Sequence, residues 1–318
     1  MPDTWRSKAL RGYGTLGYAV LVFTVLVVLG GAVVRATGSG DGCGASWPRC
    51  RGALFPPSPG VETVVEFTHR VMTAAAVVGV AALVVLAFVL WPKGHVVRRA
   101  AVSAGVFFVV ESLLGASLVL FGWVDQDISI GRLIVVPLHL TNTFLLLAAL
   151  AVTAWWGSGR PPPGSERAPG RGRLASGALT IVVIGAAGAL NALADTVVPA
   201  DSLTASAKAE LTGTARFLVD VRIAHPLIAI VGGVVVAWIV FGFASHPDAR
   251  TRRMVLWIGG LLLTQMFVGM TNIVLLTPLE IQVLHLAIAD AIWIFYVLLA
   301  ASLVGSGAAA DRLVEAAT

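Results

Sequence analysis

Eight continuous apolar runs constrain this chain more than any other feature of its sequence. Each run is long enough to cross the hydrocarbon core of a bilayer as a helix, which takes about 20 residues. The runs cover residues 15–34, 63–91, 99–122, 133–156, 174–197, 217–243, 254–276 and 279–304. Strands of a membrane barrel would alternate apolar and polar residues over about 10 positions, and these runs do not alternate. The sequence therefore predicts an all-α, polytopic membrane protein with eight transmembrane helices.

The basic residues predict which side of the membrane each loop occupies. They gather before the first run and in every second loop after it: Arg6, Lys8, Arg11, Lys93, Arg98, Arg99, Arg160, Arg167, Arg171, Arg173, Arg250, Arg252 and Arg253. Because cytoplasmic loops carry an excess of Lys and Arg, we expect these segments and both termini in the cytoplasm. The formal net charge of +5 then follows from topology. No basic cluster is interleaved with exposed aromatic residues, so nucleic acid is not an expected partner.

The first apolar run predicts the location of the chain. It follows Arg6, Lys8 and Arg11, and at about 20 residues it exceeds the 7–15 residues of a signal-peptide core. We interpret it as a retained signal anchor. Transit-peptide and lipidation patterns are not seen, so we expect a multi-pass protein in the lipid bilayer of a bacterial-type plasma membrane.

The two halves of the chain resemble each other across a segment rich in Pro, Gly and Arg at residues 157–173. The motif "GAVVR" from Gly31 resembles "GALNA" from Gly188, and "ESLLGAS" from Glu111 resembles "QMFVGMT" from Gln265. "LHLTNT" and "VLHLAIAD" form a third matching pair. We therefore expect two four-helix halves, residues 1–156 and 174–318, joined by a cytoplasmic linker. Because each half has an even number of spans, matching residues are expected at the same depth.

Four of the six histidines are expected in one layer of the membrane. They lie about six to eight residues into the four helices that run from outside to inside, or about 10 Å deep at 1.5 Å per residue; they are His69, His139, His225 and His285. A single one is most simply a core histidine bonded to a neighbouring helix. One pair per repeat at matched depth instead favours bis-histidine ligation of haem iron. Zinc fits less well, because neither pair has additional Cys or carboxylate ligands in an obvious tetrahedral set.

The only two cysteines, Cys43 and Cys50, lie in the first outer loop. In an oxidising compartment they are expected to form a disulfide. It either closes a short loop, where the stabilisation is smallest, or takes part in redox chemistry, as exposed and strained disulfides do.

The segment "GGAVVRATGSGDGCGASWPRCRGALFP", with "VEFTHR", "LHLTNT", "RIAHPLIA" and "VLHLAIAD", resembles the haem A synthase family from about residue 14 to 304. The resemblance implies two pseudo-symmetric four-helix halves. His225 and His285 would hold haem b, an electron-transfer cofactor, in the C-terminal half. His69 and His139 would ligate the substrate, haem o. Its C8 methyl group would be oxidised through an alcohol and a hydrated aldehyde to a formyl group, giving haem a for terminal oxidases.

The resemblance also implies roles for residues near the expected haem layer. Glu66 shares a helix face with His69, and the family match favours a catalytic carboxylate there over a simple position in the headgroup region or a pair with Arg70. The cysteine pair would take part in electron or haem handling. Four outer arginines are either partners of haem propionates or interfacial anchors: Arg35, Arg132, Arg216 and Arg222. Glu111 is interpreted either as a hydrogen-bonding group between helices or as part of a proton path, and Asp290 raises the same question.

One alternative function is a bis-histidine dihaem cytochrome that passes electrons between quinone and a partner. It would need the four histidines but not Glu66 or the cysteine-bearing loop. A repeat-built transporter is less favoured, since its site usually lies at the midplane. Prenyl transfer onto haem would call for aspartate-rich motifs, which the chain lacks. The expected partners are a haem O synthase and oxidase assembly factors, with quinone as a candidate electron acceptor; a homo-oligomer stays an open alternative.

Overall fold

The computed structural model describes residues 3–56, 59–161, 170–199 and 213–315. Its helices are α1 (Asp3–Ala36), η1 (Ser39–Asp41), α2 (Val61–Leu90), α3 (Val96–Leu120), α4 (Ile130–Gly157), α5 (Arg171–Val197), α7 (Gly213–Phe241), α8 (Ala249–Val274) and α9 (Leu279–Glu315). Within these residues, eight helices are long and apolar enough to cross a membrane. The all-α prediction with eight spans is confirmed. Residues 162–169 of the predicted linker, which include Arg167, lie outside the described residues.

Polar caps set the beginnings of several helices beyond the apolar runs. The side chains of His95, Ser129 and Asp248 accept backbone N–H groups of Val97, Arg132 and Thr251, at the starts of α3, α4 and α8. Such caps satisfy donors that the first helical turn leaves free. The helices therefore begin a few residues before the hydropathy pattern predicts.

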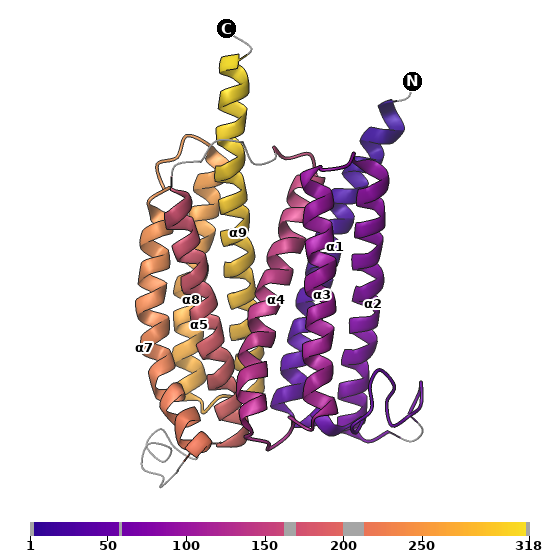
Figure 1. The fold of residues 1–318 in the computed structure, drawn as a ribbon. Helices are drawn as coiled ribbons and strands as arrows, with labels where there is room; N and C mark the ends of the chain where they lie inside the picture. The colour runs from indigo at the N-terminus through magenta and orange to yellow at the C-terminus, as the bar shows by residue number, and fades with distance from the viewer. Residues whose placement is uncertain (1–2, 57–58, 162–169, 200–212, 316–318) are drawn as a thin grey trace.

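The long helices stand side by side in one bundle (Figure 1). We call α1–α4 the N-terminal half and α5–α9 the C-terminal half. In the first, α1 packs on α2 and α4, and α3 packs on α4; in the second, α5 packs on α7, and α8 packs on α9. The N-terminal end of α1 and the C-terminal end of α9 lie at the same end of the bundle, and the loop between α1 and α2 lies at the opposite end (Figure 1).

Helices α4 and α9 join the two halves at the centre of the bundle. The Trp293 indole N–H donates to the Phe144 carbonyl oxygen over 2.6 Å, and the two rings stack with centroids 5.3 Å apart. Helix α5 comes close to the same point because Gly185 has no side chain: a Cβ there would lie 2.6 Å from the Phe144 ring. Small residues commonly allow such close packing in membrane helices.

Candidate functional site

A large, mainly apolar cavity runs between the helices of both halves. Its volume is about 1610 Å³, and side chains from all eight of the long helices that the structure describes line it. Trp47 and Pro48 of the first loop lie at its wall. The four histidines singled out from the sequence all reach this cavity: His69, His139, His225 and His285. The structure thus brings together side chains that are more than 200 positions apart in the chain.

Helix starts are poor markers of histidine depth. His225 lies twelve residues after Gly213, where α7 begins, whereas His285 lies six residues after Leu279, where α9 begins. The sequence predicts a narrower spread, of six to eight residues. Helix α7 begins four residues before its apolar run at residue 217, which accounts for part of the larger offset of His225.

Each cavity histidine packs against a glycine on a neighbouring helix. A Cβ added to these glycines would lie close to the imidazole: 3.2 Å for Gly31 and His69, 3.6 Å for Gly115 and His139, 3.2 Å for Gly188 and His225, and 2.9 Å for Gly269 and His285. The four glycines occupy matching positions of the repeated motifs. In the sequence these positions identify the repeat, but they carry no direct link to the histidines. The signal in the sequence that could have indicated these contacts is the glycine that recurs on the helix preceding each histidine-bearing helix.

Two cavity histidines have a buried ring nitrogen that no described protein group satisfies. Among the described residues, the Nδ1 atoms of His225 and His285 have no hydrogen-bond partner. A neutral imidazole carries one donor and one acceptor nitrogen, and buried polar atoms in folded proteins are nearly always satisfied. No group of three or more His, Cys, Asp or Glu side chains that could hold a metal ion is found in the described part of the chain.

Glu111 on α3 lies beside His139 on α4. The Glu111 Oε1 and His139 Nδ1 atoms are 3.2 Å apart, although His139 Nδ1 makes no hydrogen bond among the described residues. The Asn142 amide donates to Glu111 Oε2 over 2.7 Å, and the Thr143 hydroxyl donates to Oε1. These three partners are spaced i, i+3 and i+4, so they share one face of α4. Of the two interpretations of Glu111, the hydrogen bond between helices is present.

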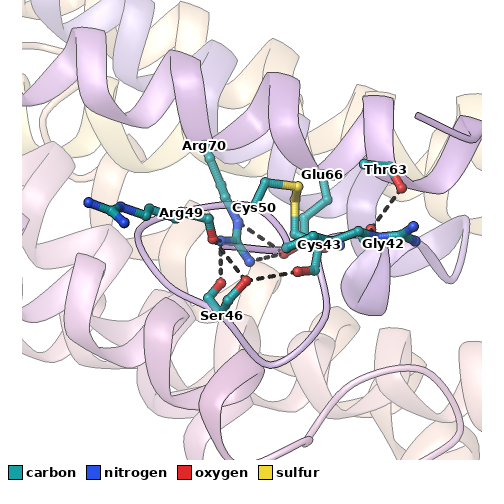
Figure 2. A network of polar contacts seen from close by, with 9 residues as sticks. Gly42, Cys43, Ser46, Arg49, Cys50, Thr63, Glu66 and Arg70 are labelled. Carbon is teal, nitrogen blue, oxygen red and sulfur yellow. Dashed lines mark hydrogen bonds and ion pairs between the residues drawn. A yellow bond between two sulfur atoms is a disulfide. The ribbon is translucent and has the colours of Figure 1, made fainter. Parts of the chain in front are cut away.

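Glu66 on α2 has two strong partners (Figure 2). Its Oε2 atom accepts the backbone N–H of Cys43 over 2.7 Å, and its Oε1 atom accepts two N–H groups of Arg70, with the Nε bond at 3.0 Å. Arg70 also donates to the carbonyl oxygens of Ser46 and Arg49, over 2.6 and 2.8 Å. The pair with Arg70 is therefore present. Glu66 also lines the cavity, and its catalytic role stays a prediction.

The first outer loop is closed by a disulfide between Cys43 and Cys50. Both cysteines are buried, with 0% and 1% of their surface exposed. The Thr63 hydroxyl on α2 donates to the Gly42 carbonyl oxygen over 2.7 Å, and a Cβ at Gly42 would collide with the backbone of Glu62. The loop therefore sits tightly on the first turns of α2 (Figure 2). Its burial differs from the exposed disulfide that a redox role would favour.

Three of the four outer arginines line the cavity: Arg35, Arg132 and Arg222. Arg35 on α1 reaches the other half, where it donates to Thr196 Oγ1 over 2.5 Å and to Gln282 Oε1 over 2.8 Å. Arg222 Nε lies 3.0 Å from Asp195 Oδ1, and Arg132 donates to backbone carbonyls of its own preceding loop. The fourth, Arg216, is half exposed and pairs with Asp220 at 2.9 Å. Arg35, Arg132 and Arg222 are therefore the candidates that remain as partners of haem propionates.

Asp290 on α9 is fully buried, and neither carboxyl oxygen has a hydrogen-bond partner among the described residues. It does not line the cavity.

Comparisons with known proteins identify the family. Residues 14–297 match the COX15-CtaA family, described as cytochrome oxidase assembly protein. A Thermus thermophilus protein named Protoheme IX farnesyltransferase is 44% identical over 311 residues, which cover 96% of this chain and 50% of that protein. Proteins named Heme A synthase from Bacillus licheniformis and Halalkalibacterium halodurans are 39% identical over 121 residues and 37% identical over 118 residues. These matches cover 36% of this chain and 37% and 38% of those proteins.

The chain spans about half the length of the Thermus protein and a smaller share of the two synthases. The family match, in contrast, extends over most of the chain and includes all four cavity histidines, Glu66 and both cysteines. This chain belongs to the COX15-CtaA family of cytochrome oxidase assembly proteins.

Proposed function

We propose that this protein is a haem A synthase, an oxidoreductase that converts the C8 methyl group of haem o to a formyl group. The observation that carries the proposal is the set of four histidines around one cavity, each packed on a glycine at a matching repeat position. Membership of a family with relatives named Heme A synthase supports the same reaction. The product, haem a, would serve terminal oxidases.

The cavity residues fit two haem groups. Imidazole rings that reach one cavity from several helices suit axial ligation of iron, and the apolar lining suits a porphyrin. We assign His69 and His139 to the substrate, haem o, and His225 and His285 to a resident haem b. When bound, that haem b would supply one-electron transfer. Arg35, Arg132 and Arg222 are proposed partners of propionates, because guanidinium groups bind carboxylates in a bidentate manner.

The proposal includes an architecture of two pseudo-symmetric four-helix halves, residues 1–156 and 174–318, with a linker at 157–173. The recurrence of glycine opposite histidine in both halves supports it. The described N-terminal end of α1 and C-terminal end of α9 lie at one end of the bundle (Figure 1). Because successive spans run in opposite directions, every second loop, the Lys- and Arg-rich ones, is expected at that same end. We therefore propose that this end is cytoplasmic, that the disulfide loop faces outward, and that the chain resides in the plasma membrane.

Glu66 is the proposed catalytic carboxylate. Only 3% of the residue is exposed, and it lies at the cavity wall. A carboxylate offers about four lone-pair positions, and the three hydrogen bonds from Cys43 and Arg70 leave one for a substrate hydroxyl or a proton. The bonds also fix the direction of the carboxylate, which general-base catalysis requires. Arg70 supplies the charge that compensates Glu66 when it is ionised.

The Thermus relative suggests a partner that supplies the substrate. Its name refers to farnesyl transfer onto haem, and this chain matches only half of it. Because the matched sequence lacks aspartate-rich motifs, we assign that activity to the other half of the Thermus protein. We propose that a haem O synthase acts next to this chain, that oxidase assembly factors receive the product, and that quinone is the final electron acceptor. Co-purification in mild detergent tests the first association.

One observation favours the second candidate, a dihaem cytochrome. The Glu66 carboxylate holds the first loop through Cys43 and Arg70, and this structural task requires no catalysis. Such a cytochrome would bind haem at all four histidines and leave haem o unchanged.

The test is to extract haems from membranes that express this chain together with a haem O synthase, and to analyse them by chromatography with mass detection. Haem a, or its hydroxylated precursor, should appear only when this chain is present. Bound haem b with unchanged haem o would favour the cytochrome. A host without its own haem a pathway provides the background.

A further inference from the structure

The cavity histidines on α4 and α9 have chemically different neighbours. His139 Nδ1 lies 3.2 Å from a carboxylate oxygen of Glu111. His285 Nε2 lies 3.2 Å from the amide nitrogen of Gln265. Glu111 and Gln265 occupy the same position of the repeated motif, four residues before Gly115 and Gly269. The two halves therefore place an acid and an amide beside corresponding histidines.

The carboxylate is held in place by groups that the C-terminal half lacks. Asn142 donates to Glu111 Oε2 and also to the Phe107 carbonyl oxygen, over 2.7 and 2.9 Å. Its amide is therefore held by two acceptors that lie one turn apart on α3. Thr143 donates to Oε1. These donors stand three and four residues after His139. The same positions after His285 are Ile288 and Ala289, which have no side-chain donor.

A carboxylate at the Nδ1 side of a histidine has a defined effect on a metal bound to Nε2. It accepts the Nδ1–H, selects that tautomer, and makes the imidazole a stronger donor. The 3.2 Å separation of His139 Nδ1 and Glu111 Oε1 places the carboxylate at this side of the ring. A neutral amide cannot withdraw the proton in the same way, and Gln265 contacts the other ring nitrogen.

We propose that Glu111 is a positioning residue that strengthens His139 as an iron ligand and lowers the reduction potential of the iron in the N-terminal half below that in the C-terminal half. The inference rests on the proposed haem sites. Its consequence is directional: an electron that leaves ferrous iron in the N-terminal half would reduce ferric iron in the C-terminal half. The asymmetry between Glu111 and Gln265 would thus set which half is the donor.

The test compares the full-length chain with Glu111→Gln, both purified in detergent and loaded with haem o without an electron acceptor. Spectroelectrochemical titration gives the reduction potential of each haem, and haem transfer to an apoprotein scavenger gives the affinity of the N-terminal site. Glu111→Gln should raise the potential in the N-terminal half and weaken haem binding there about 10- to 100-fold, the usual effect of losing such a partner. The potential in the C-terminal half should not change, and its spectrum reports folding.

An unchanged potential and affinity in Glu111→Gln, with both haems bound, would overturn the inference. If that variant does not fold, the double variant Asn142→Ala with Thr143→Val keeps the acid but frees it, and should raise the same potential by a smaller amount; no rise would overturn the inference. A parent chain that binds no haem at His69 and His139 would overturn both proposals. A parent chain that binds haem o but never converts it would overturn the synthase assignment alone, because the two potentials can still be measured.

Discussion

The two halves of this molecule share a frame but not a chemistry. In each, two histidines reach the central cavity and pack against glycines on neighbouring helices. Among the described residues, the N-terminal half adds Glu111 beside His139 and Glu66 at the cavity wall, and its first outer loop carries the disulfide. The shared frame is suited to hold a planar cofactor. The added groups are suited to act on one.

The largest predicted effect concerns the C-terminal half, where His225 lies. Replacing His225 with Ala should remove the low-spin haem b spectrum and abolish conversion of haem o, since an axial ligand and the proposed electron route are lost together. Difference spectra of reduced and oxidised membranes, with extracted haem content, provide the measurement. His246→Ala, which changes a histidine between α7 and α8, is the matched control. A persistent haem b spectrum in His225→Ala would refute the assignment of that residue.

The second prediction separates catalysis from loop anchoring at Glu66. Glu66→Gln keeps an oxygen for the Cys43 N–H but loses the charge, and should lower turnover by about 10²- to 10⁴-fold, the range for a general acid or base. Both haems should stay bound. The rate of haem a formation at saturating haem o measures the effect.

Arg70→Met is the companion variant, because it removes the loop contacts and leaves the carboxylate. If Glu66 is catalytic, Arg70→Met should lose less activity than Glu66→Gln. Equal losses in the two variants would indicate that Glu66 serves only to hold the loop.

The glycine contacts provide a graded third prediction. Alanine at Gly269 places a Cβ 2.9 Å from His285, whereas alanine at Gly115 places it 3.6 Å from His139, an ordinary contact. Overpacking typically costs about 1–3 kcal/mol, so Gly269→Ala should weaken haem retention in its half roughly 5- to 150-fold. Gly115→Ala should have little effect. Haem loss during dilution of the detergent-solubilised protein gives the comparison, and an inverted order would contradict the role of these glycines.

The spans and the four histidines were predictable because their signals are local or repeated. Lipid cannot satisfy backbone groups, so apolar runs of this length must be helices, and the duplicated motifs matched His139 with His285. Helix ends were less predictable, since α1 begins at Asp3, well before its apolar run. Polar residues can continue a helix beyond the hydrocarbon region without changing the hydropathy signal.

The contacts of Glu66 show why the rest of the site could not be predicted. Its i+4 partner Arg70 was visible in the sequence. Its other partner is the backbone N–H of Cys43, and every residue except proline carries such a donor. Which one reaches Glu66 depends on how the loop folds over α2. The close fit of Gly42 against Glu62 is likewise a property of the folded loop.

The smallest predicted effect concerns the disulfide, and it tests whether the N-terminal half needs its loop for chemistry or only for shape. Replacing Cys43 and Cys50 together with Ser should destabilise the closed loop by about 2–3 kcal/mol, the value for a ring of this size. The contacts from Thr63, Glu66 and Arg70 remain, so the loop should still cover the cavity for most of the time. We therefore expect faster proteolysis within residues 37–56, a modest decrease in haem a formation, and an unchanged haem b spectrum. Limited proteolysis and turnover on the same preparation provide the measurement. A complete loss of turnover with the loop still protected would instead assign the two sulfur atoms a redox task, and the difference between the halves would then include electron transfer at the outer surface.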